Sequence, residues 1–174
     1  EHHTAGGMSR WLPYLAELQP EMFAEISPEL AEEVGVKNGE WATLISPRAA
    51  IEARVLVTKR FKPLNVNGHT VHQIGLPYHW GVGEDAIITG DGANDLLGIT
   101  MDPNTGIQDS KYSSVAMIPG RRPRGPELVD LVEKYQREAG ITLETGMQRV
   151  TVPANDTGKA ETSTEQDAKV AEET

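Results

Sequence analysis

Apolar and polar residues alternate along positions 51–58, and this period of two predicts a half-buried β-strand. Its apolar face carries Ile51, Ala53, Val55 and Val57. Glu52 and Arg54 belong to the opposite, polar face. A short apolar run at 41–45 predicts a second strand. The connection 46–49, Ser-Pro-Arg-Ala, is typical of a turn, so we expect the two strands to form a hairpin.

Two further segments, 70–76 and 113–118, are strand candidates, and long glycine-rich connections separate them, above all at 81–94. Short strands joined by long loops favour a mainly β protein over a chain of alternating β-α-β units. We therefore expect a barrel of β-strands decorated by a few short helices.

Two segments carry the signals of helices. Residues 28–34 follow a possible N-cap at Ser27 and end at Gly35. A C-terminal helix is expected to begin at Pro126 and to stop at Gly140, after a basic turn at 121–124, Arg-Arg-Pro-Arg. Its apolar residues recur at helical spacing: Leu128, Leu131, Val132 and Tyr135.

The charge of the chain narrows the classes of partner. The 174 residues include 26 acidic and 16 basic side chains, for a net charge of −10. This acidity argues against non-specific nucleic-acid binding and against attachment to anionic lipid. Residues 151–174 are acidic and poor in large apolar residues, so a disordered acidic tail is expected there.

The absence of cysteine excludes disulfides, thiolate-bound metals and a cysteine nucleophile from this chain. No run of apolar residues approaches the roughly 18–20 that a membrane span needs, so direct membrane insertion is not expected. The sequence contains no nucleophile elbow, His-Glu-x-x-His pair or Walker loop, and we assign no catalytic residue. His69 and His72 fall on a turn and a strand and point to opposite faces, which favours surface polar residues over a metal site.

The sequence gives more support for a ligand-binding site than for a catalytic or metal site. Residues 76–81 combine Tyr78, His79 and Trp80 at the end of a predicted strand. Asn94, a strong turn at 100–106 and Lys111 follow. A phosphorylated heterocyclic ligand would use a lysine on its phosphate, an amide on its ring edge and an aromatic wall. The alternative is an ordinary surface loop packed by its aromatic residues.

The chain contains HHTAGGMSRWLP at 2–13, GLPYHWG at 75–81 and NDLLGITMDPNTGIQDSK at 94–111. In this order, the three segments resemble the C-terminal cofactor-binding domain of formate dehydrogenase alpha subunits. Those subunits belong to the dimethyl sulfoxide reductase family of molybdenum or tungsten bis-pterin oxidoreductases. The resemblance covers about residues 1–123.

This resemblance implies a double-psi β-barrel, of the aspartate-decarboxylase-like type, over residues 1–123. A C-terminal helix and extension would follow over 124–150, and the acidic tail over 151–174. In the family, the domain closes over two molybdopterin guanine dinucleotides that hold molybdenum or tungsten. The positions carried over as cofactor-binding residues are His2, His3, Thr4, Gly6, Gly7, Met8, Tyr78, His79, Trp80, Asn94 and Lys111.

The implied chemistry is oxidation of formate to carbon dioxide, or the reverse. The family's metal-ligating cysteine or selenocysteine comes from earlier domains, so the isolated chain is expected to be inactive. Expected partners are the remaining domains of the catalytic subunit and iron–sulfur or NAD- or quinone-linked electron-transfer subunits. Because the sequence starts at Glu1 rather than Met, we expect an excised domain or a processed product. Its compartment, cytoplasmic or periplasmic, stays open.

Two alternatives to this interpretation stay open. One is a separately encoded subunit of a related complex, such as formylmethanofuran dehydrogenase. The other is a non-catalytic double-psi barrel that serves as a protein-interaction module. The second alternative predicts no pterin affinity and gives no reason for the spacing between Asn94 and Lys111.

Overall fold

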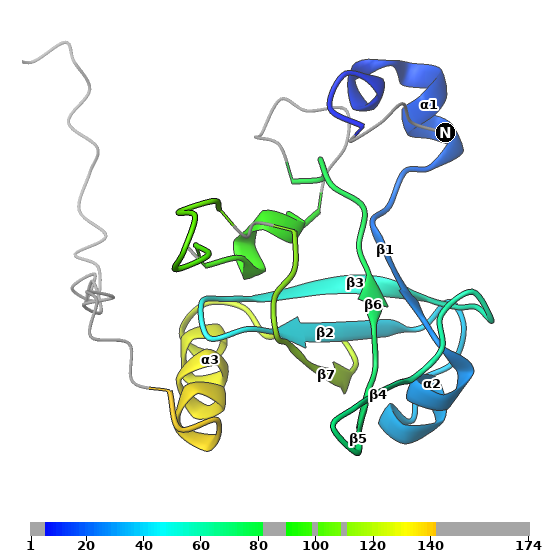
Figure 1. Ribbon diagram of the computed structural model, residues 1–174. Coiled ribbons are helices and arrows are strands. Elements are labelled where there is room, and N and C mark those ends of the chain that lie inside the picture. The colour runs from blue at the N-terminus through cyan, green and yellow to red at the C-terminus, as the bar shows by residue number, and fades with distance from the viewer. Residues whose placement is uncertain (1–5, 82–89, 99–100, 109–110, 142–174) are drawn as a thin grey trace, which may run out of the picture. The chain divides into compact units, whose positions relative to one another are not determined.

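Five strands form a curled, half-barrel sheet in the order β6-β1-β3-β2-β7 (Figure 1). The computed structural model describes residues 6–81, 90–98, 101–108 and 111–141. The strands of this sheet are β1 (Phe23–Ile26), β2 (Trp41–Ile45), β3 (Ala50–Val57), β6 (Ile74–Gly75) and β7 (Ala116–Pro119). β1 runs parallel to β3, whereas β1–β6, β2–β3 and β2–β7 are antiparallel pairs. The protein is thus mainly β in its described residues, with a few helices.

The predicted hairpin is confirmed as β2 and β3, paired from Trp41 opposite Arg54 to Ile45 opposite Ala50. Ser46 closes its turn: the Ser46 hydroxyl accepts hydrogen bonds from the backbone N–H groups of Arg48 and Ala49, both at 3.2 Å. These bonds satisfy two backbone N–H groups of the turn, which lie outside the hydrogen-bond ladder between the strands. The hairpin thus occupies the middle of the sheet, with β1 beside β3 and β7 beside β2.

Apolar residues pack against the sheet in separate clusters. One cluster gathers Ala24, Leu44, Ile51, Ala53, Trp80 and Leu96. A second joins β1 to the helix α2 (Pro28–Val34) through Ile26, Leu30, Ala42 and Val55. Trp80, from one of the motifs, is a core residue at 3% exposure and fixes the end of its loop to the sheet.

The C-terminal helix α3 (Pro126–Glu138) is confirmed and packs on the hairpin. Its Val132 is buried against Ile45 and Ala50. The remaining helical elements are the 3-10 helices η1 (Ser9–Trp11) and η2 (Ala93–Leu96) and the short helix α1 (Pro13–Leu18). In the described part of the chain, no helix is both long and apolar enough to cross a membrane.

The predicted helix at 28–34 is confirmed with both of its ends. The Ser27 hydroxyl accepts a hydrogen bond from the backbone N–H of Leu30 at 3.1 Å, and Gly35 adopts the left-handed conformation at the C-terminal end. Side-chain caps of this kind satisfy N–H groups that lack a partner within the helix.

Ser27→Ala should lower the free energy of unfolding by about 1 kcal/mol, because the N–H of Leu30 loses its acceptor at a buried helix end. Urea titration of the chain measures this loss. Ser27→Gly should cost only a few tenths of a kcal/mol, because glycine is tolerated at an N-cap far better than alanine. Since both variants lack the hydroxyl, wild-type stability in Ser27→Ala would contradict its capping role.

Two strand predictions need correction. The segment 70–76 is wrong as a single strand: β5 (His69–Val71) pairs with β4 (Leu64–Val66) in a separate ribbon, whereas β6 pairs with β1. The tight turn at Asn67-Gly68, with both residues at positive φ, folds β5 back on β4. The strand predicted at 113–118 begins only at Ala116. The predicted tail at 151–174 lies outside the described residues.

Candidate functional site

The loop that follows β6 presents the aromatic motif in a constrained backbone. His79 has a φ of 67°, a conformation that residues with a side chain rarely adopt. Its ring lies in edge contact with Tyr78, with 6.4 Å between the ring centroids. His79 is exposed, whereas Trp80 next to it is buried beneath the Arg10 guanidinium, which lies 4.7 Å from the Trp80 ring centroid. The buried tryptophan thus anchors a loop whose histidine faces outward.

The opening loop of the chain reaches the same place. A Cβ built on Gly7 would lie 3.3 Å from Cε1 of the His79 imidazole and 3.5 and 3.6 Å from its two nitrogens, so the backbone of Gly7 lies beside the ring. Gly6, at a φ of 89°, accepts a hydrogen bond from the N–H of Arg10 at 3.1 Å. Two motifs separated by some seventy residues of sequence therefore meet at His79.

Close backbone packing joins this loop to the next motif. Gly81 has a φ of 70°, and a Cβ at this position would lie 2.7 Å from the carbonyl oxygen of Gly90 and 2.9 Å from the nitrogen of Gly92. Both separations are too short for a carbon atom. Gly81 thus allows its backbone to touch the segment 90–92, which a residue with a side chain at this position would prevent.

An open pocket lies where these segments meet. It is lined by His79, Trp80, Gly81, Gly92, Ala93, Asn94 and Asp95. Asn94 lies on η2 and is exposed at this lining. The pocket thus combines an imidazole, an amide, a carboxylate and glycine backbone. Together these groups can donate and accept hydrogen bonds, as the polar edge of a heterocycle or a ribose requires.

The structure brings together only part of the predicted set of site residues. Gly7, His79, Trp80 and Asn94 lie in or beside the pocket, with Gly6, Met8 and Tyr78 adjoining them in sequence. Met8 is 81% exposed. Lys111 is exposed and is not part of the lining. His2, His3 and Thr4 lie outside the described residues.

The turn predicted between Asn94 and Lys111 forms around Asp102. Its Oδ1 accepts hydrogen bonds from the N–H groups of Asn104 and Thr105 at 2.9 and 2.8 Å and from the Thr105 hydroxyl at 3.0 Å. The hydrogen bond from the backbone of Thr105, with those from its hydroxyl and from Asn104, lowers the pKa of the Asp102 carboxyl. Met101 and Gln108 bridge across the base of the turn.

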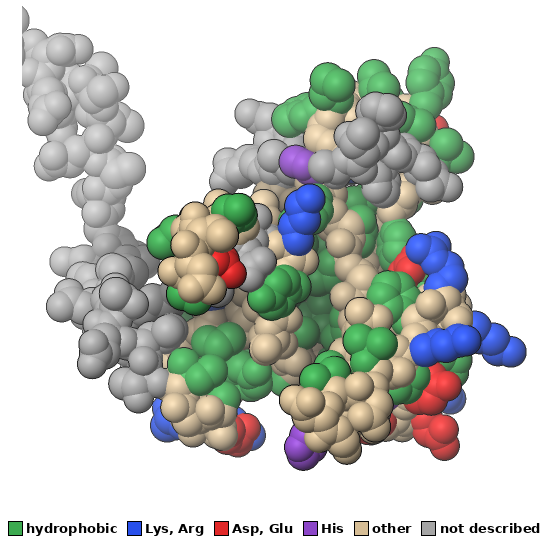
Figure 2. All heavy atoms as spheres, in the orientation of Figure 1, with side chains coloured by type: hydrophobic (Ala, Val, Ile, Leu, Met, Phe, Trp, Pro, Cys, Tyr) green, Lys and Arg blue, Asp and Glu red, His purple; other side chains and the backbone are tan. Residues whose placement is uncertain are grey.

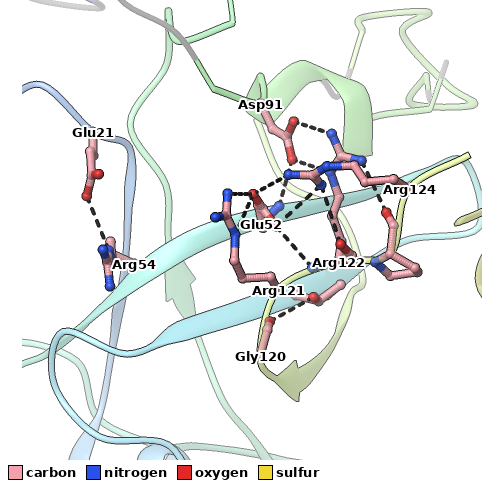
Figure 3. Close-up of polar contacts among 10 residues, drawn as sticks. Glu21, Glu52, Arg54, Asp91, Gly120, Arg121, Arg122 and Arg124 are labelled. Carbon is pink, nitrogen blue, oxygen red and sulfur yellow. Dashed lines mark hydrogen bonds and ion pairs between the residues drawn. The ribbon is translucent and has the colours of Figure 1, made fainter.

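A cluster of five charged side chains, which we call the arginine clasp, lies behind the pocket wall. It consists of Glu52, Asp91, Arg121, Arg122 and Arg124 (Figure 3). Arg122 binds Asp91 through two contacts, Nε–Oδ2 at 2.6 Å and Nη2–Oδ1 at 2.7 Å. The Asp91 Oδ2 also accepts the backbone N–H of Glu52 at 2.8 Å. Asp91 is therefore tied both to β3 and to the basic turn.

Glu52 is the second carboxylate of the clasp. It accepts hydrogen bonds from Arg121 Nη2 at 2.6 Å, from Arg124 Nη2 at 2.8 Å and from the backbone N–H of Arg122 at 3.0 Å. Burial raises the pKa of the Glu52 carboxyl. The hydrogen bonds and charges of Arg121 and Arg124 lower it by more than burial raises it, so the pKa is about 2. The alternation predicts Glu52 on a polar face, yet only 7% of it is exposed, because the basic turn covers it.

The histidines that invited a metal interpretation lie apart from the pocket lining. His69 is exposed on β5, and His72 Nε2 lies 3.1 Å from Glu33 Oε2. Within the described ranges, no three His, Asp or Glu side chains are grouped closely enough to hold a metal ion.

Residues 1–114 match the family described as Molydopterin dinucleotide binding domain, and the chain belongs to this family. The chain is similar to formate dehydrogenase subunit alpha of Megalodesulfovibrio gigas, with 42% identity over 113 residues. It is also similar to formate dehydrogenase 2 subunit alpha (cytochrome c-553) of Nitratidesulfovibrio vulgaris, with 43% identity over 111 residues. Each match covers 64% of this chain but only 11% of the relative. The nitrate-inducible formate dehydrogenase major subunit of Escherichia coli is 42% identical over 93 residues, 53% of this chain and 9% of that subunit.

Proposed function

We propose that this chain is the domain of a formate dehydrogenase alpha subunit that holds the molybdopterin guanine dinucleotide cofactor. The observation that carries the proposal is the proximity of three motifs: the backbone of Gly7 lies beside the His79 imidazole, and His79 and Asn94 line the same opening. Family membership supports the pterin dinucleotide as the ligand class. The names of the similar proteins support formate as the substrate of the complete enzyme.

The residues of the pocket fit such a ligand. Gly81 and Gly92 line the pocket without side chains, so a ligand can approach the backbone there, as a pyrophosphate requires. In our proposal, Asn94 binds polar ring or ribose atoms, Lys111 neutralises phosphate, and His79 faces the pterin or the substrate end. Met8, Tyr78 and residues 2–4 of the opening loop would complete the contacts.

The bound cofactor would supply two-electron transfer between formate and its molybdenum or tungsten. This chain would bind and orient the pterin and exclude water from it. Because the chain has no cysteine, a metal-ligating cysteine or selenocysteine would come from elsewhere in the enzyme. We therefore propose that the isolated chain is inactive, and that any iron–sulfur cluster belongs to other segments or subunits.

The same proposal includes a division of the chain. Residues 1–123 would form a double-psi barrel around the half-barrel sheet, with 124–150 as a helical extension and 151–174 as an acidic tail. α3 packs on the hairpin, which supports a role for the extension in stabilising the domain.

Exposed apolar side chains support the remaining domains of the catalytic subunit as direct partners. Figure 2 shows hydrophobic side chains gathered over η1 and α1, at the top of the view. The exposed residues in this stretch are Met8, Trp11, Leu12, Tyr14 and Leu18. Apolar patches of this kind mark protein contacts more often than free surface. Electron-transfer subunits would then contact the complete enzyme.

The test is the cofactor content of the full polypeptide that carries this chain. The wild type should contain two pterin dinucleotides and one molybdenum or tungsten per copy. Asn94→Ala and Lys111→Ala should each reduce pterin content at least several-fold, because each removes a polar contact to the dinucleotide. Pterin release on denaturation and metal analysis measure these quantities.

Lys59→Ala, an exposed lysine outside the pocket lining, is the matched control and should leave pterin content unchanged. A wild-type polypeptide with neither pterin nor metal would overturn the proposed function and favour the interaction module. Pterin and metal in a short, separately encoded chain would favour the formylmethanofuran dehydrogenase type of subunit.

A further inference from the structure

We infer that Arg122, acting through Asp91, is a positioning residue for the pocket wall that carries Asn94. The inference rests on the proposed function and adds an element that lies beyond the family match, which ends at residue 114. The basic turn at 121–124 would then be part of the cofactor site, although it contributes nothing to the pocket lining.

The far end of the wall is held by Leu96, which packs in the core with Trp80, and by Arg48, whose Nη1 donates to the carbonyl of Leu97 at 2.6 Å. Its near end depends on Asp91. Asp91 lies between Gly90 and Gly92, neither of which has a side chain that could hold the backbone in place. η2 begins two residues after Asp91, and Gly92, Ala93, Asn94 and Asp95 line the pocket in succession. The Asp91 carboxylate therefore fixes the backbone immediately before the lining residues. Displacement of Asp91 would shift the start of η2, where Asn94 lies, while Leu96 stays packed in the core.

The contact between Asp91 and Arg122 fixes the orientation of the Asp91 side chain in addition to pairing opposite charges. Its two parallel N–H···O contacts define the mutual orientation of the two planar groups, which a single contact cannot do. The side chains are only 15% and 18% exposed, so water competes little for either group. The Asp91 carboxylate in turn raises the pKa of Arg122.

The backbone of Arg122 is itself held in place by Glu52. Its backbone N–H donates to Glu52 Oε2 at 3.0 Å, and Arg121 and Arg124 on either side bind the same carboxylate. Glu52 lies on the central strand β3, which pairs with both β1 and β2. The clasp thus links the sheet to the pocket wall: Glu52 on β3 binds the backbone of Arg122, and the Arg122 side chain binds Asp91 (Figure 3).

The experiment uses the full polypeptide with Arg122→Gln, Asp91→Asn, the double variant, Arg122→Lys and the control Arg60→Gln. The readouts are pterin dinucleotide per polypeptide, its rate of loss after dilution, and kcat and KM for formate. Arg122→Gln and Asp91→Asn should each accelerate cofactor loss about 10-fold, as outer-shell substitutions commonly do. The double variant should be no worse than Asp91→Asn alone, because the contact that Arg122→Gln removes is already lost in Asp91→Asn.

Arg122→Lys should restore part of the retention, since it keeps the charge but not the paired contact. Arg60→Gln should retain cofactor like the wild type, because this exposed arginine pairs with Glu25 and belongs neither to the clasp nor to the pocket lining. In cofactor-retaining molecules, KM for formate should stay within about twofold of the wild-type value, because neither residue of the pair lines the pocket.

Retention equal to that of the wild type in Arg122→Gln and Asp91→Asn would overturn the inference while leaving the proposed function intact. The same holds for additive losses in the double variant. If Arg122→Gln fails to fold, Arg122→Lys decides: wild-type retention in a folded Lys variant would overturn the positioning role. A wild-type polypeptide without pterin would instead overturn the proposed function.

Discussion

Gly81→Ala should lower the free energy of unfolding by roughly 3 kcal/mol and should distort the pocket lined by His79 and Asn94. The added methyl group faces two penalties. A φ of 70° costs a residue with a Cβ about 1–2 kcal/mol. In addition, the Cβ would lie 2.7 Å from a backbone oxygen and 2.9 Å from a backbone nitrogen, so the segment at 90–92 has to move away. Urea titration of the chain gives the loss in stability.

Gly39→Ala separates the two penalties. Gly39 has a φ of 84°, but no atom lies within 4 Å of the position that a Cβ would take there, so this substitution should cost only about 1 kcal/mol. The difference between the two variants measures the contact between the two glycine segments. In the full polypeptide, Gly81→Ala should also lose pterin, whereas Gly39→Ala should keep it. Equal stability losses in both variants would show that the close approach contributes nothing.

The elements that the sequence predicts well are those whose signals are local. The hairpin at 41–57 shows alternation, an apolar run and a turn within seventeen residues. The helix α2 has its cap and its terminating glycine within nine residues. In both cases, the hydrogen-bonding partners are sequence neighbours, so a short window contains all the information.

Elements whose partners are distant are missed. β1 is four residues long and pairs in parallel with β3, whose residues follow some thirty positions later. Nothing in its own sequence identifies that pairing. Likewise, the segment at 70–76 looks like one strand because its residues suit a strand throughout. Its division depends on the Asn67-Gly68 turn and on the separate pairing of Ile74 with β1.

The candidate site shows the same division. His79 and Asn94 are recognisable from their motifs, and the structure places both at one pocket. The clasp is not predicted, because Asp91 and Arg122 are 31 residues apart and Glu52 and Arg124 are 72 apart. The sequence does carry one signal of it: three arginines in the four residues 121–124 of an acidic chain need carboxylate partners. Their partners become evident only in three dimensions.

Acidification should remove a specific part of the stability through Glu52. The Glu52 pKa of about 2 lies below its ordinary value of 4.5, so the native state favours the ionised carboxylate. The resulting contribution is fully present above about pH 4.5 and disappears as the pH falls through 2. For this 7% exposed side chain, the shift corresponds to about 3 kcal/mol. Glu52→Gln mimics the protonated form and should be less stable than the wild type by about this amount at pH 7.

The decisive quantity is the stability difference between the wild type and Glu52→Gln as a function of pH. It should be constant from pH 7 to about 5 and should shrink toward zero as the pH approaches 2, because the wild-type carboxyl then takes up its proton. Taking the difference removes the contribution of Asp102, whose pKa is also lowered. Glu21→Gln, which breaks the exposed contact with Arg54, is the control and should differ little from the wild type at any pH. A difference for Glu52→Gln that does not change between about pH 5 and 2 would mean that the clasp stabilises the fold by packing alone.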